Sequence, residues 1–219
     1  MMWYVIKTPW WVKKLYADYL WEMPVDEKAL YLTFDDGPHE TATPFVLDTL
    51  KQYDAKATFF CIGKNVEAHP DIYARILMEG HKTGNHTFNH LNGWKVSNEE
   101  YISNIYAASK YIDSNLFRPP YGRISKFQAR LLQQRIKLPP AKDRPYQHPP
   151  FNIVMWTVLS GDFDIKLTPE KALQNVILSS KPGSIIVFHD SAKAYSRLEY
   201  ALPRCLEYFK KEGYNFKSL

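Results

Sequence analysis

Residues 29–38 read ALYLTFDDGP, an uncharged apolar run followed by two adjacent carboxylates and a Gly-Pro turn. A short run of this kind, bounded by turn residues, is typical of a strand that is buried on both faces. Weaker examples of the same pattern follow along the chain. The further predicted strands lie at 56–61, 81–85, 115–118, 152–158 and 184–188, with a weak seventh at 214–218.

Helical patterns separate these predicted strands. Capping residues and first-turn prolines predict where the helices begin. The predicted starts are Thr43-Pro44, Pro70, Ser97, Ser125, Thr168-Pro169 and Pro203. Alternating strands and helices predict an α/β protein with a parallel sheet and helical crossovers. Six or seven such units favour a closed or nearly closed barrel, with an open doubly wound sheet as the alternative.

The chain length of 219 residues suits one domain. Within 1–28, Trp10, Trp11, Tyr16, Leu20 and Trp21 have helical spacing, which predicts an N-terminal helix that covers the barrel. The stretch 137–150 contains five prolines and is predicted to be an irregular surface insertion.

Composition limits the expected partners. The net charge is +5, but the 28 lysines and arginines are scattered and no recognition motif accompanies them, so we expect no nucleic-acid partner. Two cysteines exclude a disulfide framework, and no apolar run is long enough to predict a transmembrane segment. The first residues lack the features of a signal peptide, so a cytoplasmic location is the default expectation. Their aromatic and basic character leaves association with the cell envelope open. The oligomeric state stays unpredicted.

Residues suited to catalysis occur where the predicted strands end. Because the carboxyl ends of parallel strands open on one face of a barrel, we expect these side chains to converge. They are Asp35 and Asp36 after the first strand, His86 and His90 after the third, Arg118 at the end of the fourth, Asp162 after the fifth and His189 at the end of the sixth. The spacing of His86 and His90 places both on one side of a helical turn. With a carboxylate, this pair suits a divalent metal that keeps positions open for water.

Five segments together resemble the polysaccharide deacetylase family, carbohydrate esterase family four. They are TFDDGP at 33–38, HTFNH at 86–90, RPPYG at 118–122, WTVLSGDFD at 156–164 and IIVFHD at 185–190. The resemblance implies a distorted (β/α) barrel of about seven parallel strands. The chain departs from the family pattern at Leu159, Phe163 and Val187, where the family usually has Asp, Trp and Leu.

The resemblance also implies a role for each matching residue. Asp36, His86 and His90 would bind one divalent metal ion, zinc as first choice with cobalt or nickel as alternatives. Asp35 would be the general base, paired with Arg118, and His189 the general acid, tuned by Asp162. Tyr121 would contact the substrate and donate its backbone N–H to the oxyanion, and Thr87 would brace the histidine loop.

The expected activity is hydrolysis of acetyl groups from a glycan that contains N-acetylglucosamine. Trp94, just past His90, is a candidate for stacking on a sugar ring, with loop packing as the alternative. Three other functions stay open: O-deacetylation of xylan or another ester, non-catalytic glycan binding, and a non-haem Fe(II) oxygenase. The oxygenase conflicts with the predicted strand–helix alternation, since two histidines and one carboxylate serve those enzymes on a different fold.

Overall fold

The computed structural model describes residues 4–134 and 150–219. The strands are β1 Ala29–Asp35, β2 Ala57–Cys61, β3 Lys82–Asn85, β4 Leu116–Phe117, β5 Asn152–Ile153, β6 Val158–Leu159, β7 Ile185–His189 and β8 Asn215–Phe216. The α-helices are α1 Trp10–Leu15, α2 Ala42–Gln52, α3 Gly63–Ala68, α4 Pro70–Met78, α5 Asn98–Ala108, α6 Lys126–Leu132, α7 Pro169–Ser179 and α8 Tyr195–Lys211. A short 3₁₀ turn, η1, spans Pro120–Gly122.

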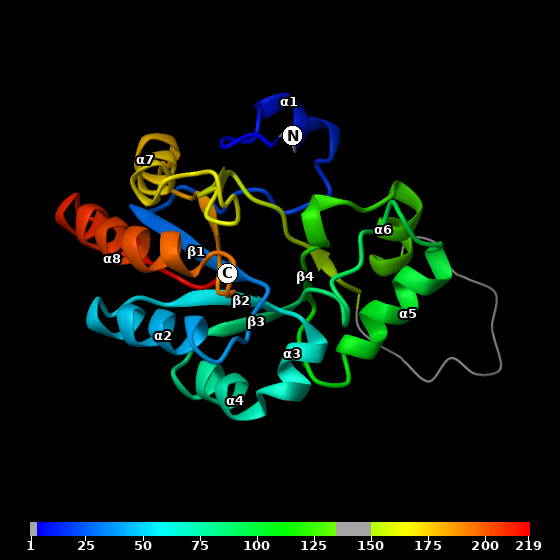
Figure 1. Cartoon of the computed structure of the whole chain (residues 1–219). Helices are drawn as coiled ribbons and strands as arrows, with labels where there is room; N and C mark the ends of the chain where they lie inside the picture. The colour runs from blue at the N-terminus through cyan, green and yellow to red at the C-terminus, as the bar shows by residue number, and fades with distance from the viewer. Residues whose placement is uncertain (1–3, 135–149) are drawn as a thin grey trace.

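The strands form one curled sheet in the order β5-β4-β3-β2-β1-β7-β6, and β8 pairs with β1 outside this path. Every pairing between named strands of the described residues is parallel. The helices follow one another around the outside of the strands, from α7 and α8 past α2 and α4 to α5 and α6 (Figure 1). The predicted α/β class, with a distorted barrel of about seven parallel strands, is confirmed.

The prediction of one strand over 152–158 is wrong. β5 pairs with β4 at one edge of the sheet, whereas β6 pairs with β7 at the other edge. The intervening residues carry the chain between the two edges, and the N-terminal segment pairs with them: Met155 donates its N–H to Leu20 O, and Thr8 donates to Thr157 O. The whole stretch is apolar, and an unbroken apolar run cannot reveal such a break.

The predicted N-terminal helix is wrong for most of its length, because most of the segment is irregular chain. Only α1, Trp10–Leu15, is helical within residues 4–28. Lys7, Leu20 and Glu22 instead form isolated bridges with Val158, Val154 and Ser184. The segment packs on the barrel through side chains such as Trp21 and Val12 as well as through backbone hydrogen bonds. The predicted insertion at 137–150 lies outside the described residues, apart from Pro150.

Pro203 does not open the last helix, as was predicted, because it lies inside α8. A proline inside a helix removes one backbone hydrogen bond and normally bends or ends the helix. Here the inward face of α8 is buried on both sides of the proline, at Leu198, Leu202, Leu206 and Phe209. Tertiary packing therefore outweighs the local preference.

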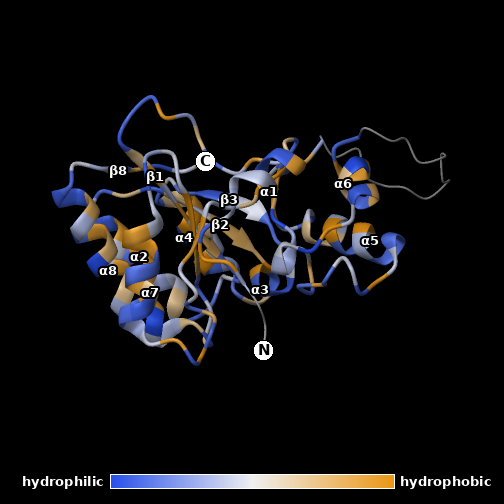
Figure 2. Ribbon diagram, turned by 90° about the horizontal axis from the view of Figure 1, so that it is seen from above, coloured by the Kyte–Doolittle hydropathy of each residue, from blue (hydrophilic) through white to orange (hydrophobic). Residues whose placement is uncertain are grey.

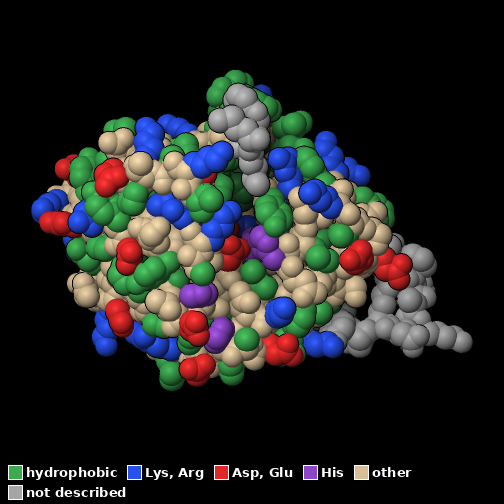
Figure 3. Space-filling model, viewed as in Figure 1, with side chains coloured by type: hydrophobic (Ala, Val, Ile, Leu, Met, Phe, Trp, Pro, Cys, Tyr) green, Lys and Arg blue, Asp and Glu red, His purple; other side chains and the backbone are tan. Residues whose placement is uncertain are grey.

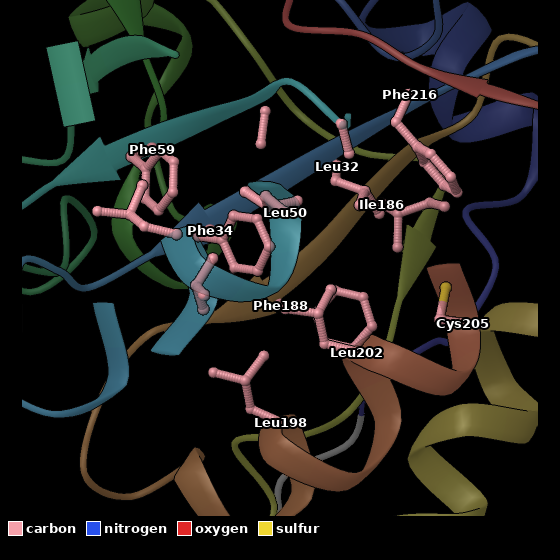
Figure 4. Packing of buried hydrophobic residues seen from close by; sticks show 14 of the residues in the cluster. Leu32, Phe34, Leu50, Phe59, Ile186, Phe188, Leu198, Leu202, Cys205 and Phe216 are labelled. Carbon is pink, nitrogen blue, oxygen red and sulfur yellow. The ribbon is translucent and has the colours of Figure 1, made fainter. Parts of the chain in front are cut away.

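The largest core cluster fills the space between the sheet and helices α2, α7 and α8. The ring of Phe34 stacks on Phe59 at 5.1 Å and on Phe188 at 6.1 Å between ring centroids. Leu50 of α2 and Leu202 of α8 close over these rings (Figure 4). Figure 2 shows that hydrophobic residues concentrate on the strands and the helix faces beside them. This packing fixes the strands, and so fixes the positions of the residues at their carboxyl ends.

Candidate active site

The end of β1 supplies two carboxylates. Asp35 is buried and pairs in register with His189 of β7, which places these two residues side by side. Asp36 follows with φ 83°, a left-handed conformation that is uncommon for a residue other than glycine. Asn65 Nδ2 donates a hydrogen bond to Asp36 O over 2.7 Å and helps to hold this conformation. The backbone turn is therefore fixed from outside the motif.

The two histidines lie in a loop, and the predicted helical turn is wrong. Thr87 and His90 both have left-handed φ angles, 65° and 56°. Asn85 Oδ1 accepts a hydrogen bond from Thr87 N over 2.9 Å, and Thr87 Oγ1 accepts one from Leu91 N over 3.2 Å. These bonds give the loop a fixed shape without a helix. Both imidazoles still point to the same place.

Asp36, His86 and His90 meet at one point. Asp36 Oδ1 lies 3.7 Å from His86 Nε2 and 3.1 Å from His90 Nε2, and the three candidate ligand atoms all lie within 4.8 Å of one another. Ligands of a tetrahedral zinc ion are separated by about 3.4 Å, given bonds of about 2.1 Å. Asp36 Oδ1 is also buried without a hydrogen-bond partner among the described residues. The residues present therefore fit a divalent cation.

Hydrogen bonding and burial prepare these ligands for a metal. His86 Nδ1 lies 2.7 Å from Arg118 O, which places its proton on Nδ1 and leaves the lone pair of Nε2 toward Asp36. Burial lowers the pKa of His86 to about 4. Burial raises the pKa of Asp36, but contact with His90 and the charge of His189 outweigh it and hold that pKa below its ordinary value. At neutral pH the site thus offers a neutral imidazole and an ionised carboxylate, the forms that bind metals.

Arg118 binds Asp35 from inside the barrel. Its Nη1 donates to Asp35 Oδ1 over 2.7 Å, and both side chains are buried. The guanidinium also donates to Thr33 Oγ1 and Met155 O, and it lies 4.0 Å from the centroid of the Phe60 ring. A charge-assisted hydrogen bond from a rigid guanidinium fixes the orientation of a carboxylate. Asp35 is therefore held by Arg118 and is not one of the three candidate metal ligands.

The half-buried His189 and the buried Asp162 form the second pair. Asp162 accepts from His189 Nδ1 through Oδ1 and from His189 N through Oδ2, each over 2.7 Å. Burial lowers the pKa of His189, but the adjacent Asp162 charge and hydrogen bond outweigh it and raise that pKa to about 9. Arg197 of α8 donates a hydrogen bond from Nε to the backbone carbonyl oxygen of Asp162 over 2.5 Å. His189 is thus a protonated imidazole at neutral pH, suited to donate a proton.

Aromatic residues border these groups. Tyr121 has φ 59°, is exposed, and its ring centroid lies 4.7 Å from that of His90. Phe163, where the family usually has Trp, packs edge-on against His189 at 5.1 Å between centroids, and Leu159 is buried. Trp94 is exposed, and the guanidinium of Arg123 lies 4.3 Å from its ring centroid. One face of Trp94 is therefore already covered.

Sequence reasoning missed Asp190, which is fully buried next to His189. Its carboxylate accepts hydrogen bonds from Gly37 N over 3.0 Å and from Thr43 Oγ1 over 2.5 Å. Burial raises the pKa of Asp190 to about 8, although the hydrogen bond from Thr43 acts in the opposite direction. Thr43, predicted as a helix cap, instead lies within α2 and serves this contact. Asp190 thereby connects the DDGP turn to β7 and α2. The only signal of this contact in the sequence is the position of Asp190 directly after His189.

The candidate ligands and both ion pairs open on one face. Figure 3 shows histidine and acidic side chains next to one another in a hollow of that face. The converged set comprises Asp35, Asp36, His86, His90, Arg118, Asp162 and His189, with Tyr121 beside it. Trp94 stands apart, linked to this set through Arg123 and the η1 turn.

Comparison with known proteins identifies the family. The polysaccharide deacetylase family model matches residues 22–137, which are 116 of the 219 residues. The chain is 37% identical over 202 residues to a peptidoglycan-N-acetylglucosamine deacetylase of Bacillus cereus, covering 90% of this chain and 88% of that relative. It is 33% identical over 172 residues to a chitooligosaccharide deacetylase of Azorhizobium caulinodans, covering 75% of each.

A solved structure shows the same fold. The crystal structure of the Bc1960 peptidoglycan N-acetylglucosamine deacetylase superimposes with a TM-score of 0.82 at 34% sequence identity, covering 97% of this chain and 95% of that one. The family match over more than half of the chain and these similarities agree with the converged site. This hydrolase belongs to the polysaccharide deacetylase family.

Proposed function

We propose that this deacetylase removes acetyl groups from N-acetylglucosamine units of an oligo- or polysaccharide, and that it requires a divalent metal, with zinc as first choice. The convergence of Asp36, His86 and His90 carries the proposal. Two imidazoles and one carboxylate suit zinc, while cobalt and nickel suit them as well. The similarity to deacetylases of peptidoglycan and chitooligosaccharides supports the substrate class.

A cation held there would polarise the acetamide carbonyl and lower the pKa of an adjacent water molecule. Asp35 takes the proton from the water as its oxygen attacks the carbonyl carbon. Arg118 orients the Asp35 carboxylate for that transfer through the hydrogen bond from its Nη1. The sequence of events needs a base that is not itself a metal ligand, and the separate environments of Asp35 and Asp36 provide it.

The second half of the reaction needs an acid and an oxyanion donor. An amine leaves poorly unless it is protonated, so His189 donates its proton to the nitrogen as the C–N bond breaks. Asp162 holds the His189 ring in the required orientation. The Tyr121 N–H, which has no acceptor among the described residues, is available to the oxyanion, a contact often worth about 3 kcal/mol. The products are acetate and the free amino sugar.

Acetate release from N-acetylglucosamine oligomers tests this proposal. The zinc-loaded protein should release acetate, and a chelator should abolish the release until zinc, cobalt or nickel is returned. Asp35→Asn should lower the rate by about a hundredfold to ten-thousandfold while metal binding persists. His86→Ala should lose both acetate release and metal binding. The exposed Asp113 and the half-buried His69 supply the matched controls Asp113→Asn and His69→Ala, which should keep full activity.

The same assay separates the remaining functions. The site could also hydrolyse an acetate ester, so acetylated xylan belongs in the substrate panel. Release from xylan alone would replace the amide proposal with an ester one. Glycan binding that is insensitive to chelator, with no acetate released from any substrate, would favour a binding module.

A further inference from the structure

Helix α1 presents an unusual surface, because none of its residues is buried. Trp10 and Trp11 are 72% and 57% exposed, and Leu15 is 58% exposed. Val5, just before the helix, is also 58% exposed. Large apolar side chains gathered on one surface mark a site of interaction with a partner or a membrane. We call these four residues, with Lys7 and Lys14, the α1 patch.

Contacts on the inner side of α1 keep the α1 patch facing away from the barrel. Trp11 and Leu15 are four residues apart, so they share one side of the helix. On the inward side, Val12 packs against a core cluster of the barrel, and Lys13 Nζ pairs with Glu22 Oε2 over 2.6 Å. Because that side is anchored, the tryptophans cannot turn toward the core without breaking both contacts.

The charge of the α1 patch indicates the kind of partner. Lys7 and Lys14 are exposed and form no ion pair within the described residues. The whole chain carries a net charge of +5. Tryptophan prefers the boundary between lipid headgroups and acyl chains, and adjacent lysines attract anionic headgroups. A second copy of this chain would instead bring the lysines of two identical patches together, since a two-fold contact is self-complementary.

We propose that the α1 patch docks this protein on the surface of an anionic phospholipid bilayer. α1 lies at the top of the molecule in Figure 1, on the opposite side from α4. Figure 3 shows hydrophobic and basic side chains at this top, while the hollow with histidine and acidic side chains opens toward the viewer. Docking through the α1 patch therefore leaves the hollow free for substrate. No helix of the described residues is long and apolar enough to span a membrane.

Co-sedimentation of the full chain with vesicles tests the proposal. The protein should pellet with vesicles of phosphatidylcholine mixed with phosphatidylglycerol, and should bind pure phosphatidylcholine and high-salt mixed vesicles more weakly. Trp10→Ala/Trp11→Ala should weaken binding at least about tenfold. Each of Lys7→Gln and Lys14→Gln should weaken it about fivefold. Trp94→Ala, which removes a similarly exposed tryptophan elsewhere, should leave vesicle binding unchanged.

Several results would overturn the proposal. They are no pelleting with mixed vesicles, equal pelleting of the double tryptophan variant, or equal binding to neutral and anionic vesicles. A dimer in analytical ultracentrifugation that dissociates in the double variant would assign the patch to a second copy. If the tryptophan variant does not fold, the two lysine variants carry the test alone. Acetate release from soluble oligomers should be unchanged in all these α1-patch variants, so membrane docking and catalysis fail independently.

Discussion

Arg118 donates a hydrogen bond to Asp35 over 2.7 Å, and this ion pair is buried inside the barrel while Asp36, the next residue, faces the candidate metal position. Two adjacent carboxylates thus have different partners. Arg118 binds the Asp35 carboxylate, and His86 and His90 lie around the Asp36 carboxylate. In the proposed mechanism, this division lets one motif supply both the base and a metal ligand.

Replacing Arg118 should therefore damage both stability and activity. Arg118→Met leaves the Asp35 carboxylate buried without its partner, and breaking such a pair typically costs about 3–5 kcal/mol. Denaturant unfolding measures the loss, and acetate release should fall in parallel. Arg118→Met/Asp35→Leu should recover much of the stability, since neither charge remains, but none of the activity. Recovery of activity in the double variant would show that Asp35 is not the base.

Asp162 should set the alkaline limit of activity. The pKa of His189 is raised to about 9, so its acid form is present below that pH and is lost above it. A cation held by Asp36, His86 and His90 would lower this limit by repulsion. Asp162→Asn removes the charge that raises the pKa, so the falling limb of the kcat profile should move to lower pH. An unchanged limb would exclude His189 as the titrating acid.

The same shift has a consequence for folding in metal-free protein. A histidine whose pKa is raised in the folded state stabilises the fold fully below its unfolded pKa of about 6.5, and this contribution disappears as the pH rises through about 9. Unfolding free energies measured with a chelator should fall over this window in the parent protein, and should fall much less in Asp162→Asn. A fall in unfolding free energy confined to pH values below 6 would contradict the raised pKa of His189.

Gly37 should be irreplaceable because of its approach to Asp190. A Cβ atom at Gly37 would lie 2.0 Å from Asp190 Oδ2, so Gly37→Ala must displace the carboxylate that holds the DDGP turn. Displacing a group that orients a ligand typically costs about 10- to 100-fold in metal affinity. We expect that loss in a zinc titration, with a stability loss of about 1–3 kcal/mol.

Gly213→Ala is the matched control for this prediction. Gly213 has φ +76° and no neighbour within 4 Å of an added Cβ, so alanine there costs only the left-handed backbone strain, about 1–2 kcal/mol. Metal affinity and acetate release should not change in this variant. Equal metal affinity in Gly37→Ala and the parent would show that Asp190 does not position Asp36.

The sequence predicted the features that local patterns encode. Apolar runs marked β1 and β7, and Ser97 and Ser125 cap α5 and α6 as expected. The residues at the strand ends converge because parallel strands share a carboxyl edge, a rule of topology that needs no coordinates. The family motifs then assigned an expected role to each of these residues.

What escaped prediction depends on contacts between distant residues. β5 and β6 are separate because β5 pairs with β4 and β6 pairs with β7, at opposite edges of the sheet. The N-terminal segment is placed by backbone hydrogen bonds between residues more than a hundred positions apart, such as Leu20 with Met155. Pro203 is tolerated because of the packing around α8. No local sequence pattern distinguishes Asp190 from other aspartates, because its contact with Gly37 forms only in the folded chain.

Anomalous diffraction at the zinc edge, on crystals grown with zinc, tests the central claim most directly. The structure predicts one strong peak bonded to Asp36 Oδ1 and to the Nε2 atoms of His86 and His90, at about 2.0–2.2 Å from each. Asp35 should remain with Arg118, outside bonding distance of the ion. Zinc bound at another position, or no peak beside Asp36 in crystals of protein that releases acetate, would contradict it.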